Sequence, residues 1–163
     1  MIIDLDPMHF TLLKPQASQA GAVLTCKQAL ALLQGGPAKT CLNAQGFTIA
    51  CAGLTELWPG RGMAWAIFGA SIRYNMPEIV REMRRMIDAS SFHRVEMYLT
   101  AGRRSVDVRL AGMLGFRYEC TAVQFLPNRN DADVYIWTRP SSPIKHPPRS
   151  AQPLLCPQAA VQP

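Results

Sequence analysis

The most constraining feature of the sequence is a predicted helix, Met76–Ala89, that lies between two predicted strands. The strand before it is the apolar run Met63–Phe68, and the strand after it spans Phe92–Thr100. Apolar residues recur along the helix at helical spacing, which places them on one side. A strand, a helix and a second strand in this order predict a right-handed crossover. We therefore expect Met63–Phe68 and Arg94–Leu99 to form a parallel pair at the centre of a sheet.

The remaining predicted elements surround this unit. Asn75 followed by Glu78 has the spacing of a capping box at the start of the central helix, and Gly115 lies where a left-handed residue is favoured at the end of a later helix. The other predicted elements are strands at Phe10–Lys14, Ala38–Leu42, Gly46–Leu54, Phe116–Leu126 and Val134–Thr138, and helices at Ser18–Leu33 and Arg103–Leu114. This order predicts an α+β (mixed αβ) fold with a mostly antiparallel sheet of about six or seven strands, one central parallel pair and flanking helices.

A change in composition near Arg139 predicts two parts, a domain at residues 1–139 and a tail at residues 140–163. Seven of the 24 residues from Pro140 to Pro163 are proline, and no acidic residue follows Asp133. This composition predicts an extended, polyproline-like arm outside the core, and a flexible end without a role is the alternative. We expect the arm to bind another protein or a neighbouring copy through basic and apolar residues, namely Lys145, Arg149, Leu154, Leu155 and Val161.

Composition also limits the class of protein. Hydrophobic residues make up 48% of the 163 residues and charged residues 17%, which predicts a packed domain and excludes global disorder. Lys and Arg outnumber Asp and Glu by 17 to 11, a balance that favours anionic partners without choosing among them. No apolar run reaches the ~18 residues of a membrane span. The start lacks a basic signal region, and the five cysteines form no C-x-x-C pair. Both features predict a cytoplasmic protein. Cys41 and Cys51 could lie on adjacent strands, but the reducing compartment favours two buried free thiols.

Three pieces of the sequence resemble the GNAT acyltransferase superfamily. The first is the strand GMAWAIF with the capped helix after it, the second is HRVEMYL–TAGRRS–VDVRLAGML, and the third is the turn Leu114-Gly115-Phe116 that opens the next strand. The chain is also similar to short GNAT-like proteins of tailed phages, one type of which is an internal virion protein of podophages. The shared features there are a strand of the AWAIF kind before an amphipathic helix and a late strand–loop–helix that ends in glycine.

The resemblance implies a place for acetyl-CoA between the two parallel strands, with its pyrophosphate on backbone N–H groups of the following loop. The family signature of that loop, Q/R-x-x-G-x-G/A, is absent, since the chain has Phe68-Gly-Ala-Ser-Ile-Arg-Tyr-Asn75 there. We therefore expect no cofactor, or only weak binding of acetyl-CoA. The residues that would bind it are Gly69, Ala70, Ser71, Arg73 and Arg103.

The resemblance also implies a tyrosine that protonates the leaving thiolate, and this position is Ala111 here. Tyr98 or Tyr118 is the candidate replacement, subject to geometry. Glu56 and Glu96 are the candidate general bases, because a carboxylate facing a cleft can have its pKa raised by desolvation. Each is more often a solvent-facing residue. The three scattered histidines have no metal-binding spacing, so no metal site is expected.

Two functions from different classes follow from these observations. The favoured one is a catalytically degenerate GNAT-like domain that acts as a phage virion or assembly protein, in the host cytoplasm or the virion, and binds partners through its tail. The alternative is an active acetyl-CoA-dependent N-acetyltransferase. A nucleic-acid-binding role ranks third because no nucleic-acid motif accompanies the clustered arginines, which are Arg81, Arg84, Arg85, Arg103 and Arg104.

Overall fold

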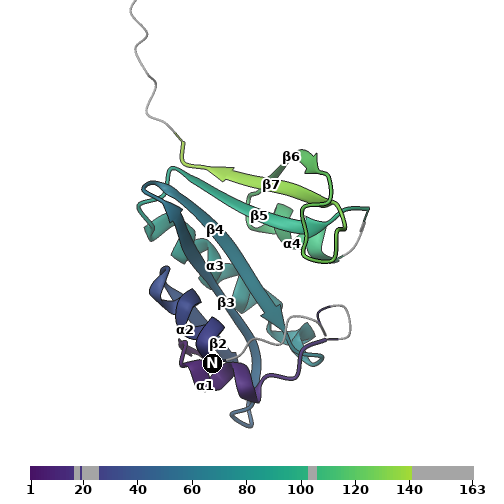
Figure 1. Cartoon of the computed structure of the whole chain (residues 1–163). Coiled ribbons are helices and arrows are strands. Elements are labelled where there is room, and N and C mark those ends of the chain that lie inside the picture. The colour runs from purple at the N-terminus through teal and green to yellow at the C-terminus, as the bar shows by residue number, and fades with distance from the viewer. Residues whose placement is uncertain (17–18, 20–25, 103–105, 141–163) are drawn as a thin grey trace, which may run out of the picture.

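The computed structural model describes residues 1–16, 19, 26–102 and 106–140 of the chain (Figure 1). The predicted tail residues after 140 therefore lie outside the described residues, as do Arg103 and Arg104. The elements in chain order are β1 (Ile2–Asp4), α1 (Pro7–Leu12), α2 (Cys26–Gln34), β2 (Ala38–Leu42), β3 (Thr48–Trp58), β4 (Arg61–Phe68), the 3₁₀ helix η2 (Ile72–Asn75), α3 (Met76–Ala89), β5 (Arg94–Thr100), α4 (Val106–Met113), β6 (Arg117–Ala122) and β7 (Ala132–Thr138).

The strands form one seven-stranded sheet in the order β1-β2-β3-β4-β5-β7-β6. Every neighbouring pair is antiparallel except β4 and β5, which are parallel and are connected through α3. This confirms the predicted mixed sheet, the central parallel pair and the crossover helix. The helix α3 has the predicted bounds, Met76–Ala89.

The parallel pair is joined only at its beginning. Backbone pairing of β4 with β5 runs from Arg61 opposite Arg94 to Met63 opposite Glu96, and no further pairs follow. Beyond this point the two strands separate, so the sheet splits into one half made of β1–β4 and another made of β5, β7 and β6 (Figure 1). We call the paired beginning the closed end of the split and the separated remainder the open end.

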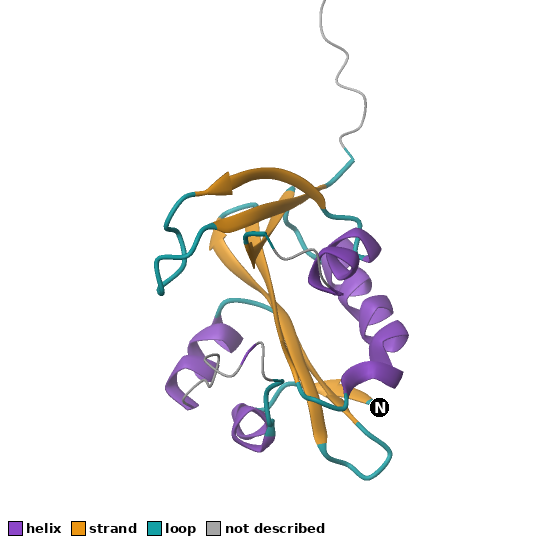
Figure 2. Ribbon diagram, turned by 90° about the vertical axis from the view of Figure 1, so that its right-hand side faces the viewer, coloured by secondary structure: helices purple, strands orange, loops and turns teal. Residues whose placement is uncertain are grey.

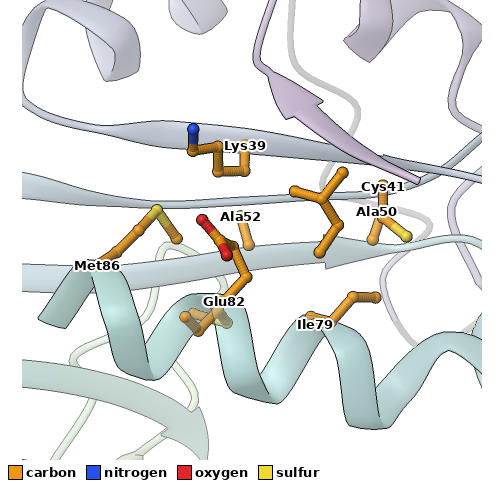
Figure 3. A pocket seen from close by; sticks show the side chains of 9 residues that line it. Lys39, Cys41, Ala50, Ala52, Ile79, Glu82 and Met86 are labelled. Carbon is orange, nitrogen blue, oxygen red and sulfur yellow. The ribbon is translucent and has the colours of Figure 1, made fainter.

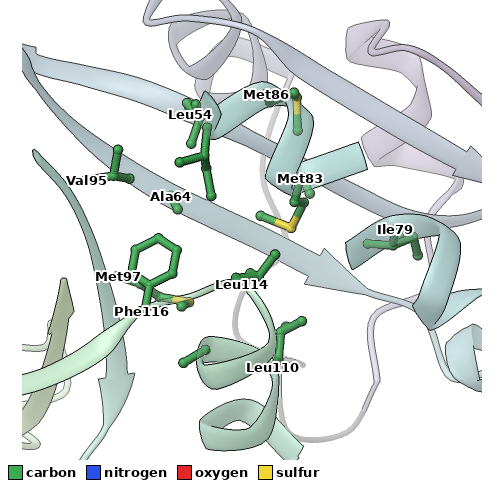
Figure 4. Packing of buried hydrophobic residues seen from close by; sticks show 14 of the residues in the cluster. Leu54, Ala64, Ile79, Met83, Met86, Val95, Met97, Leu110, Leu114 and Phe116 are labelled. Atoms are coloured by element: carbon green, nitrogen blue, oxygen red, sulfur yellow. The ribbon is translucent and has the colours of Figure 1, made fainter. Parts of the chain in front are cut away.

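Helices cover both faces of the sheet, with α3 and α4 on one side and α1 and α2 on the other (Figure 2). The core under α3 and α4 is the larger one, and Figure 4 shows its packing. Alternation along the strands explains this division, since Ala50, Ala52 and Leu54 of β3 face α3 whereas Cys51 belongs to the smaller core under α1. We call these sides the α3 face and the α1 face.

The apolar residues of the predicted strands and helices predict nine largely buried side chains. Seven of them are buried, namely Ile67, Met83, Ile87, Val95, Met97, Leu110 and Leu114. Two are only half-buried, Trp65 and Val80. Val80 packs at the margin of the larger core. Trp65 lies on the α1 face, where its ring packs on Phe10 with 5.8 Å between centroids and its indole N–H donates to Thr55 Oγ1 at 3.1 Å. Its polar edge therefore has a partner.

The predicted strand at Phe10–Lys14 is wrong, because residues 7–12 form the helix α1. Asp6 explains the difference, since its carboxylate accepts the N–H of Met8 at 2.8 Å and its own N–H donates to His9 Nδ1 at 3.0 Å. Pro7 then occupies the first helical position, where its missing N–H removes no bond. The helix N-cap at Asp6 therefore outweighs the strand-like pattern of the apolar residues that follow it. The short strand β1 was not predicted.

Other boundaries differ in smaller ways. The predicted capping box at Asn75 is not formed, because η2 precedes α3 and Asn75 already has near-helical backbone angles, φ −100° and ψ −1°. Gly115 does adopt the predicted left-handed conformation, with φ +86°. Within the described residues, α2 spans Cys26–Gln34 and α4 spans Val106–Met113, whereas the predicted helices are Ser18–Leu33 and Arg103–Leu114. Much of the difference falls on residues outside the described part.

Candidate functional site at the split of the sheet

A cavity of about 280 Å³ lies at the open end, where β4 and β5 separate. Its lining comes from β4, β5, α4 and Gln19, and includes Met63, Trp65, Phe68, Tyr98, Thr100 and Leu110. The cavity exists because the β4–β5 ladder ends at Met63 and Glu96, so that no neighbouring strand fills the space beyond. The resemblance to the GNAT superfamily implies that the pantetheine arm of acetyl-CoA would lie in this position.

Glu96 lies at the closed end and is one of the most deeply buried side chains, at 1% exposure. Its Oε1 accepts from Arg94 Nε at 2.7 Å and pairs with the guanidinium of Arg61, while its Oε2 accepts from the hydroxyl of Tyr98 at 2.5 Å. Burial raises the pKa of Glu96, but the hydrogen bonds from Tyr98 and Arg94 and the two cations outweigh it and hold this pKa below its usual range. Glu96 therefore has neither the raised pKa that would suit a general base nor the solvent-facing position that is more common for glutamate.

The interactions of Glu96 continue across the sheet to β6. Arg94 also donates through Nη1 to Glu119 Oε1 at 2.9 Å, and this hydrogen bond lowers the pKa of Glu119. On the other side, the guanidinium of Arg61 lies 4.1 Å from the ring centroid of Trp58. The buried Nε of Arg61 has no acceptor among the described residues. We call Arg61, Arg94, Glu96, Tyr98 and Glu119 the Glu96 cluster, and its contacts tie β4, β5 and β6 together.

Tyr98 is the candidate acid that lines the cavity. Burial and the hydrogen bond to Glu96 raise the pKa of Tyr98 to about 12, which makes its hydroxyl a poor proton donor near neutral pH. Its ring packs on Phe125 with 4.7 Å between centroids. Tyr118, the other candidate, does not line this cavity, since its ring packs edge-on against Tyr135 and its hydroxyl lies 2.9 Å from Thr121 Oγ1.

Glu56 lies away from this cavity. It is exposed near the end of β3, opposite Gly62 of β4, and lines a separate groove of about 550 Å³ with Glu82 and Arg85 of α3. Alternation explains its position, because Glu56 shares the α3 face with Leu54. The structure therefore does not bring the two candidate bases together.

The loop after β4 offers little to a pyrophosphate. The N–H of Gly69 donates to the carbonyl of Ile49 at 2.8 Å, so the sheet already uses this predicted phosphate ligand. Ala70 and Ser71 are exposed, and the side chain of Ser71 makes no capping hydrogen bond to η2. The side chain of Arg73, like the whole of Arg103, lies outside the described part of the chain.

Ala111 is fully buried in the larger core, at 0% exposure. Its carbonyl accepts the N–H of Phe116 at 2.9 Å, which fixes the turn after α4. The neighbouring Leu110 lines the cavity. At this position the resemblance implies a tyrosine that donates a proton to the leaving thiolate, and this chain has only a methyl group there.

Sequence reasoning missed Gln19, which lies along the open edge of β4. Its Nε2 donates to the carbonyl of Ala66 at 3.1 Å, and its Oε1 accepts the N–H of Phe68 at 2.8 Å. The N–H of Gln16 donates to the carbonyl of Phe68 at 2.8 Å. No local pattern could have indicated these contacts, because their partners lie 47 to 52 residues away in the sequence.

A second pocket, between α3 and the strands β2 and β3, is too small for a ligand, at about 10 Å³ (Figure 3). The side chain of Cys41 lines it, and Cys51 lies on the opposite face of the sheet. Both are free and buried as expected, and burial raises the pKa of the Cys51 thiol to about 12. Neither thiol is therefore activated for nucleophilic chemistry.

The described residues add three further observations. The α3 arginines, Arg81, Arg84 and Arg85, are exposed on the outer side of the helix, and Arg85 pairs with Glu82 at 3.4 Å. No cluster of three or more His, Cys, Asp or Glu side chains within the described ranges has a metal-binding arrangement. No helix in these ranges is long and apolar enough to cross a membrane.

No family model matches the sequence, and no curated protein matches it in a sequence search. The structure, in contrast, is similar to many solved acetyltransferase structures. A ribosomal-protein-alanine N-acetyltransferase from Brucella melitensis superposes with a TM-score of 0.65 at 11% identity, over 85% of this chain and 99% of that one. A chimeric spermidine N-acetyltransferase from Vibrio cholerae gives 0.63 at 15% identity, over 85% and 94%.

An IAA acetyltransferase from Bacillus cereus gives a TM-score of 0.62 at 11% identity, over 85% of this chain and 99% of that one. At these identities the likeness concerns the fold alone. It agrees with the sheet order, the single parallel pair and the split between β4 and β5. The chain therefore has the fold of the GNAT N-acetyltransferases.

Proposed function

We propose that the chain is a catalytically degenerate GNAT-like domain that acts as a structural or interaction protein of a phage virion or its assembly. The observation that carries this proposal is the pairing of Glu96 with Tyr98. A base needs a carboxylate whose pKa lies near the working pH, and an acid needs a proton that it can release. Here the arginines keep Glu96 ionised with a low pKa, and Glu96 keeps the proton on Tyr98.

Two further features support a non-catalytic role. The family's tyrosine position is the buried Ala111, and the N–H of Gly69 is bonded within the sheet. The phage part of the proposal rests on the sequence resemblance. The interaction part rests on the composition of the tail, in which Lys145, Arg149, Leu154, Leu155 and Val161 would contact another protein or a neighbouring copy.

The alternative, an active N-acetyltransferase, is favoured by one observation. The cavity of about 280 Å³ between β4 and β5 has the position that a cofactor arm would need, and Tyr98 lines it. In this case acetyl-CoA would supply the acyl group. The residues Gly69, Ala70 and Ser71 would contact the pyrophosphate, together with Arg73 and Arg103.

Calorimetric titration of acetyl-CoA into the purified full-length chain distinguishes the two functions. We expect no binding, or weak binding with a dissociation constant above the micromolar range, and no release of free CoA in the presence of amine acceptors. An active spermidine N-acetyltransferase assayed in parallel verifies the measurement. A submicromolar dissociation constant with turnover would contradict the degenerate function and put the enzyme first.

A further inference from the structure

The open edge of β4 carries backbone groups that no neighbouring strand satisfies. Because β5 leaves β4 after Met63, the groups of Ala66 and Phe68 that point toward the split have no ladder partner on β5. Unpaired backbone groups at a sheet edge are strong sites for another chain to bind. Three of these groups nevertheless have partners, and all three partners come from Gln16 and Gln19.

The side chain of Gln19 binds this edge in the way that one residue of a neighbouring strand does. In a parallel ladder, one residue donates to the carbonyl of a residue on the next strand and accepts from an N–H two positions further along. The carboxamide of Gln19 makes the same pair of bonds, to the Ala66 carbonyl at 3.1 Å and from the Phe68 N–H at 2.8 Å. It therefore substitutes for the N–H and the C=O of one residue of an extended chain.

The surrounding residues hold Gln19 in this position. The N–H of Gln19 donates to the carbonyl of Gln16 at 2.8 Å, and Pro15 bridges to Gly69 at the end of β4. Gln19 also lines the cavity at the open end. An extended ligand in this cavity would need the two backbone groups that the carboxamide occupies.

We propose that Gln19 is an intramolecular ligand of the β4 edge, so that an amide-bearing chain enters the split only by displacing it. This inference rests on the proposed function, because it names one cause of weak ligand binding. The ligand class that competes is an extended chain whose two successive secondary amides present an N–H and a C=O to the same side, such as the pantetheine arm of acetyl-CoA. Displacement of Gln19 breaks two hydrogen bonds and leaves the Ala66 carbonyl and the Phe68 N–H free to bind the incoming chain.

The first test measures binding to full-length variants. Calorimetry with acetyl-CoA and with pantetheine, which lacks the pyrophosphate, compares the wild type with Gln19→Ala and with the isosteric Gln19→Glu. Removal of the carboxamide should strengthen binding of both probes by about tenfold to a hundredfold, the range of two modest hydrogen bonds. Gln19→Glu loses the donor to Ala66 at nearly constant volume and should change binding in the same direction. Gln45→Ala, in an exposed turn, is the matched control and should leave binding unchanged.

The second test measures the contact itself by hydrogen exchange. In Gln19→Ala the amide of Phe68 should exchange at least tenfold faster, since its acceptor is gone. The amide of Gly69, which bonds to Ile49, should exchange at its wild-type rate and serves as the internal control.

The results separate the two proposals. Tight binding and turnover by the wild type would contradict the degenerate function alone. Equal binding of pantetheine by the wild type and Gln19→Ala, or no binding by either, would overturn the role of Gln19. Unchanged exchange at Phe68 would overturn it as well.

Discussion

The two ends of the β4–β5 split satisfy their polar groups in different ways. At the closed end, charged side chains of β4, β5 and β6 neutralise one another, and the central one, Glu96, is removed from solvent. At the open end, the polar groups belong to the backbone of β4, and a single side chain, Gln19, binds two of them. The difference shows that at both ends of this split, the charged groups and the backbone groups are largely bound by other groups of the same chain.

The largest expected effect tests the closed end. Glu96→Ala leaves the cations of Arg61 and Arg94 partly buried without their shared carboxylate, and should lower the free energy of unfolding by about 3–5 kcal/mol. Urea denaturation measures this loss. Glu56→Ala, at the exposed candidate base, is the matched control and should change stability by less than about 0.5 kcal/mol. If Glu96→Ala loses less than the control, the Glu96 cluster does not hold the closed end together.

The next prediction tests the open end. Leu110 of α4 is 5% exposed and lines the cavity. Leu110→Ala should lower the free energy of unfolding by about 2–5 kcal/mol, as for other buried leucines. Met113→Ala, at an exposed position of the same helix, should cost far less. A loss below about 0.5 kcal/mol for Leu110→Ala would mean that α4 does not pack at the open end as described.

A smaller effect at the closed end concerns how the free energy of unfolding depends on pH. The pKa of Tyr98 is raised to about 12 in the folded state, above its ordinary value of 10.0. The unfolded chain therefore loses this proton first, and the stabilising contribution of the hydroxyl is lost as the pH rises between these two values. We expect a decrease of about 1–2 kcal/mol across this range. Thermal or urea denaturation at several pH values measures it.

The variant Tyr98→Phe isolates this contribution. It should be less stable at neutral pH and should show a weaker dependence on alkaline pH than the wild type. Tyr118→Phe, which keeps Tyr98 and changes an exposed hydroxyl, is the control. Identical alkaline profiles for Tyr98→Phe and the wild type would show that Glu96 does not hold the tyrosine proton.

The smallest expected effect on stability concerns the tail, which belongs to neither end of the split. Removal of residues 140–163 should leave the melting temperature nearly unchanged and abolish assembly with a partner or neighbouring copy. Differential scanning calorimetry and analytical ultracentrifugation measure the two properties. Unfolding of the truncated chain would mean that the tail stabilises its own domain, and the proposed partner role would fail.

The sequence predicts those parts of the fold whose signal is local. The unit β4–α3–β5 is predicted correctly because the periodicity of Met76–Ala89 and the two apolar strands all point to the same arrangement. The helix α1 is missed because the decisive contact is a single cap at Asp6. The four-residue run Phe10–Leu13 taken by itself resembles a strand.

The candidate site shows the same limit. Arg94, Glu96 and Tyr98 alternate along β5, and this spacing of two could have placed them on one face. Their burial, and hence the direction in which the pKa of Glu96 shifts, depends on Arg61 from another strand. The contacts of Gln19 are more remote still, and only the folded chain brings them together.

The short join between β4 and β5 has a mechanical consequence. Three residue pairs connect these strands, whereas eight connect β3 with β4. A force that pulls β4 away from β5 therefore meets less backbone resistance at this join than it would between β3 and β4 or between β5 and β7. Under such a load β4 and β5 should separate before either of those two neighbouring pairs does.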